Sequence, residues 1–234
     1  MSSVFRFKEF EVDQQGCAMK INTDGVLLGA LSQGNDISSV LDIGTGTGVI
    51  ALMMAQKYVN AKIYAVEIDQ SACQAAIKNF ANSKFHDRLE GVYGTFEDVE
   101  NPESFDLIIS NPPFYTNSLH NPDIRKKLAR HADYDFFDRL LLYAFKKLSP
   151  SGSLSLILPS DLAVYVRKQA LDLGLFVQQT IDIKSFDNSE VFRKIYTFTR
   201  EQTQEQIDEF IIYKERGVYS DQYKELLKPF FLAF

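Results

Sequence analysis

The run DIGTGTG, residues 42–48, is the feature that most limits the folds open to this chain. It begins inside SVLDI (39–43), an apolar run expected to form a buried strand, and leads into the helical segment GVIALMMAQKY. Glycines at alternate positions let the backbone turn sharply and let a ligand approach the start of a helix closely. A strand, a glycine-rich turn and a helix in this order indicate an α/β fold with a ligand site at the turn.

Strands and helices continue to alternate as far as Gly174. The further predicted strands are KIYAVE (62–67), LEGVYG (89–94), FDLIIS (105–110) and SLSLIL (153–158). The predicted helices are TDGVLLGAL with a cap at Thr23, one capped by Asp69, one from near Asp133 and one from Ser160 to Gly174. This pattern predicts the α/β class with a Rossmann-like, mostly parallel and doubly wound sheet.

The segment after Gly174 predicts a different arrangement. LFVQQTIDIK and KIYTFT are long extended runs joined by a polar stretch, which is typical of an antiparallel hairpin added to the sheet. EFIIY predicts a last strand, and a short helix is expected to end before Pro229. We expect one domain over residues 1–234, with an N-terminal extension over 1–38 and the core over 39–234.

Composition excludes several classes of protein. Cys17 and Cys73 lie far apart and no CxxC occurs, so neither a disulfide framework nor a metal site is expected. No signal peptide or membrane span is indicated, which predicts a cytoplasmic protein without a membrane partner. The net charge of −6 argues against wholesale binding of polyanions but leaves room for a local basic patch.

The spacing of the glycines decides which ligand the turn suits. A dinucleotide fingerprint would need a glycine at Val49, and no GK[ST] follows, which excludes a P-loop. Asp42 would repel a pyrophosphate but suits the cationic amino-acid end of S-adenosylmethionine. Glu67 ends the second strand, where an acid accepts the ribose hydroxyls. The turn, with Gly44, Gly46 and Gly48, and this acid resemble those of the class I S-adenosylmethionine-dependent methyltransferases, over roughly residues 39–160.

The loop after the third strand occupies the place where such enzymes hold the adenine ring of the cofactor. Thr95 stands where many relatives have an acid, so the group that contacts the adenine amino group stays open. Phe96 either lies on the adenine ring or belongs to the core.

SNPPFY (110–115) follows the apolar strand FDLIIS. It resembles the (D/N/S)-P-P-(Y/F) motif of methyltransferases that act on an amino nitrogen conjugated to a π-system. The Asn111 side-chain oxygen and the Pro112 carbonyl can accept the two N–H bonds of such an amine, which favours the transition state. Pro113 fixes the corner, and Phe114 stacks on a flat substrate. The alternative is a rigid loop after a strand.

Four stretches together resemble the bacterial tRNA1(Val) (adenine-37) N6-methyltransferase family, over essentially the whole chain. They are FRFKEFEVDQQGCAMKINTDGVLLGA, NPPF, RKKLARH and VYSDQYKELLKPFFLAF. The resemblance implies transfer of a methyl group to the adenine beside the anticodon. It also implies that Lys20, Thr23 and Asp24 close over the methionine end of the cofactor, and that residues 111–114 hold the flipped adenine.

A basic stretch follows the corner. Residues 115–132 hold four positive side chains against Asp123, a net charge of +3, and the four are Arg125, Lys126, Lys127 and Arg130. We expect them to contact phosphates of the tRNA anticodon loop, with His131 in a capping or phosphate-contacting role rather than as a base. The alternative is an ordinary solvated loop.

Three other functions stay open at this point. A protein-glutamine methyltransferase uses a similar corner but carries a helical domain before the fold, and only about 38 residues precede the first predicted strand. A guanine-N2 rRNA methyltransferase also uses NPPF, though usually with a duplicated N-terminal half. A non-catalytic RNA-binding module is disfavoured because both motifs are intact.

Overall fold

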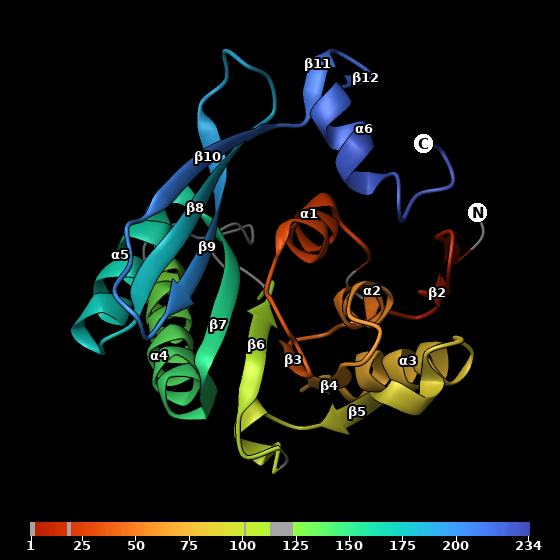
Figure 1. The fold of residues 1–234 in the computed structure, drawn as a ribbon, viewed down its shortest axis with the longest axis horizontal. Helices are drawn as coiled ribbons and strands as arrows, with labels where there is room; N and C mark the ends of the chain where they lie inside the picture. The colour runs from red at the N-terminus through yellow and green to blue at the C-terminus, as the bar shows by residue number, and fades with distance from the viewer. Residues whose placement is uncertain (1–2, 18–19, 101, 113–123) are drawn as a thin grey trace.

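The structure is a computed structural model, and it describes residues 3–17, 20–100, 102–112 and 124–234, with the side chains of 124–133 excepted (Figure 1). Pro113 and Phe114 lie outside the described residues. Within the described part, no helix is both long and apolar enough to cross a membrane.

An eight-stranded sheet forms the centre of the fold, in the order β10-β8-β9-β7-β6-β3-β4-β5. Its strands are β3 (Ser39–Ile43), β4 (Lys62–Glu67), β5 (Leu89–Tyr93), β6 (Phe105–Ser110), β7 (Leu148–Pro159), β8 (Phe176–Lys184), β9 (Val191–Thr199) and β10 (Gln206–Ile211). β9 runs antiparallel to β7 and β8, whereas the other neighbouring pairs are parallel. The prediction of a Rossmann-like sheet with a C-terminal antiparallel hairpin is confirmed.

Helices cover both faces of the sheet (Figure 1). They are α1 (Thr23–Leu31), α2 (Val49–Lys57), α3 (Gln70–Ala81), α4 (Ile124–Lys147), α5 (Ser160–Asp172) and α6 (Asp221–Leu227), with short 3-10 turns η1 (His86–Arg88) and η2 (Phe96–Asp98). Leu107 and Ile109 of β6 enter the core under α1 and α2, while Phe105 and Ile108 enter the core under α4 and α5. Burial on both faces explains why three consecutive residues of β6, Leu107, Ile108 and Ile109, are all apolar.

Two helix starts differ from their predictions. The cap of α1 is Asn22, whose side-chain oxygen accepts from the Gly25 backbone N at 2.8 Å, so Thr23 as the cap was wrong. α4 begins at Ile124, nine residues before the predicted start at Asp133. The apolar stripe marks only the turns that pack on the sheet, and the preceding stretch continues the helix because Lys, Leu, Ala and Arg are good helix formers. Asp69 caps α3 as predicted, accepting from the Ala72 backbone N at 2.8 Å.

The two ends of the chain lie side by side (Figure 1). The opening residues form a hairpin of β1 (Val4–Arg6) and β2 (Glu11–Asp13), and Phe7 makes a bridge to Phe231. Near α6, the chain adds a small hairpin of β11 (Tyr213–Glu215) and β12 (Val218–Tyr219), which the sequence did not predict. The predicted last strand EFIIY is thereby divided, since β10 ends at Ile211 and Tyr213 begins β11.

Candidate active site

The predicted cofactor and catalytic segments meet at the carboxyl edge of four neighbouring strands. The glycine turn follows β3, Glu67 ends β4, Thr95 follows β5 and Asn111 follows β6. β3 pairs with β4 and with β6, and β4 pairs with β5, all in parallel. Ligands of open α/β sheets bind at this edge.

The three positions of the turn require glycine for different physical reasons. All have positive φ, at 71° for Gly44, 57° for Gly46 and 89° for Gly48. A Cβ added at Gly44 or Gly46 would meet no atom within 4 Å, so the space beside both is open to a ligand. At Gly48 it would lie 2.4 Å from the Phe80 ring, so this glycine serves the packing of α3. The first two therefore fit a cofactor cradle.

Glu67 binds the turn directly. One carboxylate oxygen accepts from the Gly46 backbone N at 2.8 Å, and the other accepts from the Asp69 backbone N at 2.9 Å. The carboxylate is thus held at the mouth of the glycine turn by two backbone groups. A fixed acceptor at the end of β4 fits recognition of the ribose hydroxyls.

Asp42 is fully buried beneath the turn. Its Oδ2 accepts from the Thr45 hydroxyl at 2.6 Å and from the Ala51 backbone N at 3.1 Å. Burial raises the pKa of Asp42 to about 7, and the nearby Glu67 charge adds to this while the two hydrogen bonds oppose it. Oδ1 is buried and has no partner among the described groups, and the role of Asp42 at the cationic end of the cofactor stays a prediction.

The loop after β5 is folded on itself. Asp98 Oδ2 accepts from both the Thr95 backbone N, at 2.8 Å, and the Thr95 hydroxyl, at 2.9 Å. Phe96 is buried, 5.1 Å from the Tyr143 ring and 6.0 Å from the Phe136 ring. The structure therefore places Phe96 in the core, which is the second of the two alternatives, and no described contact directs its ring into the cleft.

The catalytic corner is anchored at the end of β6. The buried Ser110 hydroxyl donates to the Ile43 carbonyl at 2.7 Å, which ties β6 to β3 immediately before the corner. The Asn111 Nδ2 atom donates to the Asn22 side-chain oxygen at 3.4 Å, and Pro112 is buried. The corner thus lies against the first turn of α1.

That contact brings the predicted cofactor-closing segment to the cleft. Lys20 and Thr23 are exposed near the start of α1. Asp24 instead accepts from Arg193 Nε at 2.7 Å, and both side chains are partly buried. The sequence did not single out Asn22 within the N-terminal stretch that resembles the family, and Arg193 belongs to no motif. Their partners are 89 and 169 residues away.

The predicted phosphate-binding residues all fall on the first half of α4, where side chains lie outside the described part. They are Arg125, Lys126, Lys127, Arg130 and His131. Further along the helix, Arg139 donates to Glu97 at 2.6 and 2.9 Å. This ion pair joins the middle of α4 to the loop after β5, at the cleft. The basic residues belong to the half of the helix that precedes this contact.

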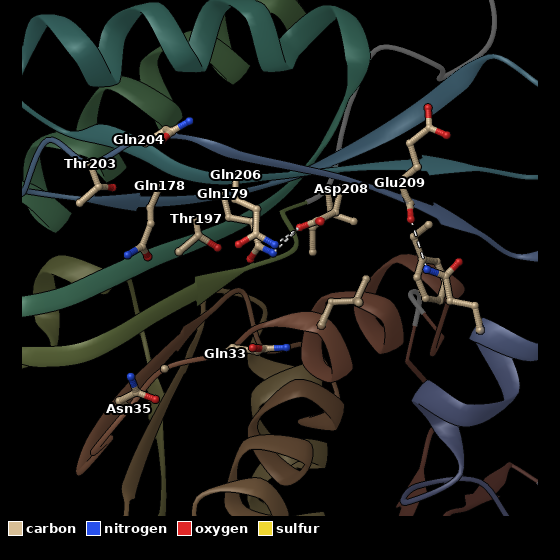
Figure 2. A pocket seen from close by; sticks show the side chains of 15 residues that line it. Gln33, Asn35, Gln178, Gln179, Thr197, Thr203, Gln204, Gln206, Asp208 and Glu209 are labelled. Carbon is tan, nitrogen blue, oxygen red and sulfur yellow. Dashed lines mark hydrogen bonds between the residues drawn. The ribbon is translucent and has the colours of Figure 1, made fainter.

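A separate polar groove of about 700 Å³ lies between α1 and the C-terminal strands. Figure 2 shows Gln179 and Gln206 pointing toward Asp208, whose Oδ2 accepts from both amides at 2.8 Å. None of the predicted site residues lines this groove. Its side chains bind one another, so volume alone does not mark the functional site.

Residues 22–166 match the family described as the methyltransferase small domain. A Pedobacter heparinus protein named tRNA1(Val) (adenine(37)-N6)-methyltransferase is 46% identical over 100% of both chains. A Bacteroides thetaiotaomicron protein of the same name is 37% identical over 97% of both chains. The chain belongs to the tRNA1(Val) (adenine-37) N6-methyltransferase family.

The fold of this N6-methyltransferase family member is shared more widely. A predicted O-methyltransferase from Agrobacterium tumefaciens superposes with a TM-score of 0.68 at 17% identity, covering 88% of this chain and 96% of that one. Family and fold together imply S-adenosylmethionine as the cofactor. Among the described residues, no group of three His, Cys, Asp or Glu side chains could hold a metal ion, and the absence of a metal stays a prediction.

Proposed function

We propose that this chain transfers a methyl group from S-adenosylmethionine to the exocyclic N6 of adenine-37 in tRNA1(Val). The full-length relatives carry this activity in their names. The observation that carries the proposal is the position of Asn111, directly after β6 and beside the strand that leads into the glycine turn. An amide at this point reaches an amine brought to the methyl end of the cofactor.

The donor half of the cleft fits S-adenosylmethionine. Gly44 and Gly46 leave open space beside the turn, and a carboxylate at Asp42, buried beneath the turn, would favour the cationic methionine end through its charge. Glu67 would accept from the ribose hydroxyls, exchanging or sharing its bond to the Gly46 N. When bound, the cofactor supplies an electrophilic methyl group on a positively charged sulfur.

Asn111 and Pro112 would activate the amine. The adenine N6 is a poor nucleophile because its lone pair is delocalised into the ring. The Asn111 oxygen and the Pro112 carbonyl accept its two N–H bonds and direct the lone pair at the methyl carbon. The bound cofactor would supply the methyl group and its sulfur would keep the electron pair of the C–S bond, while the methylated nitrogen would release a proton to water. Both hydrogen bonds strengthen as positive charge develops on nitrogen, so they favour the transition state.

The first half of α4 would hold the anticodon loop. Its four basic residues supply local positive charge on a chain whose net charge is −6. Phosphate contacts fix the position of the RNA without reading its sequence. An adenine in a loop is already partly unstacked, which lowers the cost of extruding it. A tRNA substrate also supports the predicted cytoplasmic location.

The test is methyl transfer from labelled S-adenosylmethionine into separate pools of tRNA, ribosomal RNA and release factors. We expect label in tRNA only, and nucleoside mass spectrometry should identify N6-methyladenosine, mapped to position 37 of tRNA1(Val). Label in a release factor would instead indicate glutamine methylation, and N2-methylguanosine in ribosomal RNA would indicate a guanine-N2 enzyme. Either result would overturn the proposal.

A further inference from the structure

The side-chain oxygen of Asn22 serves two donors at once. It accepts from the Gly25 backbone N at 2.8 Å, which caps α1, and from Asn111 Nδ2 at 3.4 Å. The second bond is long, and it joins residues 89 positions apart in the sequence. The cap of α1 and the amide of the catalytic corner are therefore connected through one atom.

This arrangement fixes the orientation of the Asn111 amide. The two ends of a side-chain amide are similar in shape, so its orientation is decided by hydrogen-bond partners. A backbone N–H can only donate, so the Asn22 atom that caps Gly25 must be the oxygen. Only a donor can lie favourably opposite that oxygen, and the NH2 end of Asn111 supplies one. The Asn111 oxygen then occupies the other end of the planar amide.

Gly25 makes this approach possible. A Cβ added there would lie 3.3 Å from Asn111 Nδ2 and 3.5 Å from the Asn22 oxygen. The first distance is tighter than about nine in ten Cβ contacts, so a larger residue would press on the Asn111 amide. The absence of a side chain at Gly25 leaves room for the corner to rest against the first turn of α1.

We infer that Asn22 is a positioning residue, which holds the NH2 end of Asn111 so that the amide presents an oxygen acceptor to the substrate. The inference rests on the proposed function of Asn111. An amine substrate needs an acceptor at this point. The opposite amide orientation would leave the Asn22 oxygen facing the Asn111 oxygen, where neither group can donate. Asn22 therefore helps to select an amine as the group that enters the cleft.

Two substitutions separate this role from simple capping. Serine and aspartate cap helices about as well as asparagine. Asn22→Asp keeps an oxygen at the same reach, whereas the shorter Asn22→Ser keeps the cap but falls short of Asn111. We expect Asn22→Ser to lower kcat roughly fivefold to tenfold, the size expected for losing one net hydrogen bond. Asn22→Asp should recover most of kcat.

The measurements are kcat and KM with tRNA, the Kd for S-adenosylmethionine by calorimetry, and the melting temperature of each full-length variant. Both variants should keep the wild-type Kd and melting temperature. Equal kcat values for Asn22→Ser and wild type, or equal losses in both variants, would overturn the inference. Asn111→Ala is measured alongside, because an active Asn111→Ala enzyme would refute the proposed mechanism, whereas an inactive one beside a fully active Asn22→Ser enzyme would refute only the role of Asn22.

Discussion

The donor half and the amine half of the cleft are built in different ways. In the donor half, Asp42, Glu67 and the glycine turn are held by four hydrogen bonds between residues at most 21 positions apart. In the amine half, the described contact of the Asn111 side chain comes from the cap of α1, 89 positions away. The donor half is therefore held by contacts between residues closer together in the sequence. The amine half depends on a contact between two distant segments.

The difference predicts separable consequences of mutation. A cradle whose groups already bind one another is pre-organised, so its loss should appear in cofactor affinity. A corner that meets the substrate only in the reacting complex should affect the rate of the chemical step. Variants on the two sides of the cleft therefore test whether cofactor binding and the chemical step depend on different residues.

The largest effect is expected for Asn111→Ala. Removing the acceptor that stabilises the developing charge should lower kcat by about 10²-fold or more, as for other pre-organised groups of this kind. The Kd for S-adenosylmethionine should change little, because the described hydrogen bond of the Asn111 side chain goes to Asn22 and not to the glycine turn. Single-turnover kinetics and calorimetry measure the two quantities.

Asn60→Ala is the matched control for Asn111→Ala, since Asn60 is exposed and lies before β4, away from the corner. If Asn111→Ala loses as much cofactor affinity as kcat, Asn111 also contributes to cofactor binding. The proposed division between the donor half and the amine half would then be wrong.

A smaller effect is expected from reversing the charges of Arg125, Lys126 and Lys127 to glutamate. The KM for tRNA should rise by roughly tenfold or more at physiological salt. The slope of log KM against log salt should fall by about one unit for each phosphate that the variant no longer neutralises. Steady-state assays from low to high salt measure both.

The double reversal at Lys126 and Lys127 is compared with a control of equal charge. That control is the double reversal at Lys146 and Lys147, in the last turn of α4. It changes the charge of the same helix at its opposite end. If both variants alter the salt slope equally, the effect belongs to the net charge of the protein and not to the half of α4 beside the cleft.

Glu67→Ala should weaken S-adenosylmethionine binding roughly tenfold, with a smaller change in kcat at saturating cofactor. The substitution removes the ribose acceptor, worth about 1 kcal/mol or more, and it also removes the acceptors of the Gly46 and Asp69 backbone N atoms. Glu90→Ala, which removes an exposed partner of Lys62 on the neighbouring strand, should leave the affinity unchanged. If calorimetry gives the same Kd for Glu67→Ala and Glu90→Ala, Glu67 does not contribute to cofactor binding.

The smallest effect concerns stability and pH. The pKa of Asp42 is about 7 in the folded protein, above the ordinary value of 3.8. Between these values the folded state keeps a proton that the unfolded chain has lost. The resulting penalty on folding therefore grows as the pH rises from about 4 and levels off above about 7.

Asp42→Asn should flatten that dependence. Without cofactor, the free energy of unfolding of the variant minus that of the wild type should increase by roughly 1–3 kcal/mol between pH 5 and pH 8. Urea titrations at the two pH values measure it. A constant difference would mean that Asp42 is already ionised in the folded protein at pH 5.

Several structural details lay beyond sequence reasoning for identifiable reasons. The nine extra residues at the start of α4 carry no apolar stripe, so periodicity could not place the first turn. Thr23 and Asn22 are both plausible caps, and only the backbone bond to Gly25 distinguishes them. Phe96 fits a ligand platform and a core position equally well in sequence, until its contacts with Tyr143 and Phe136 are known.

Sequence patterns were enough to predict the order of strands and helices, the glycine turn and the acid at the end of β4. These follow from apolar periodicity and from steric limits that act within a few residues. The contact of Asn22 with Asn111 and the ion pair of Asp24 with Arg193 are visible only in the folded protein. Such contacts form between segments far apart in the chain, because packing of α1 against the sheet brings their side chains together.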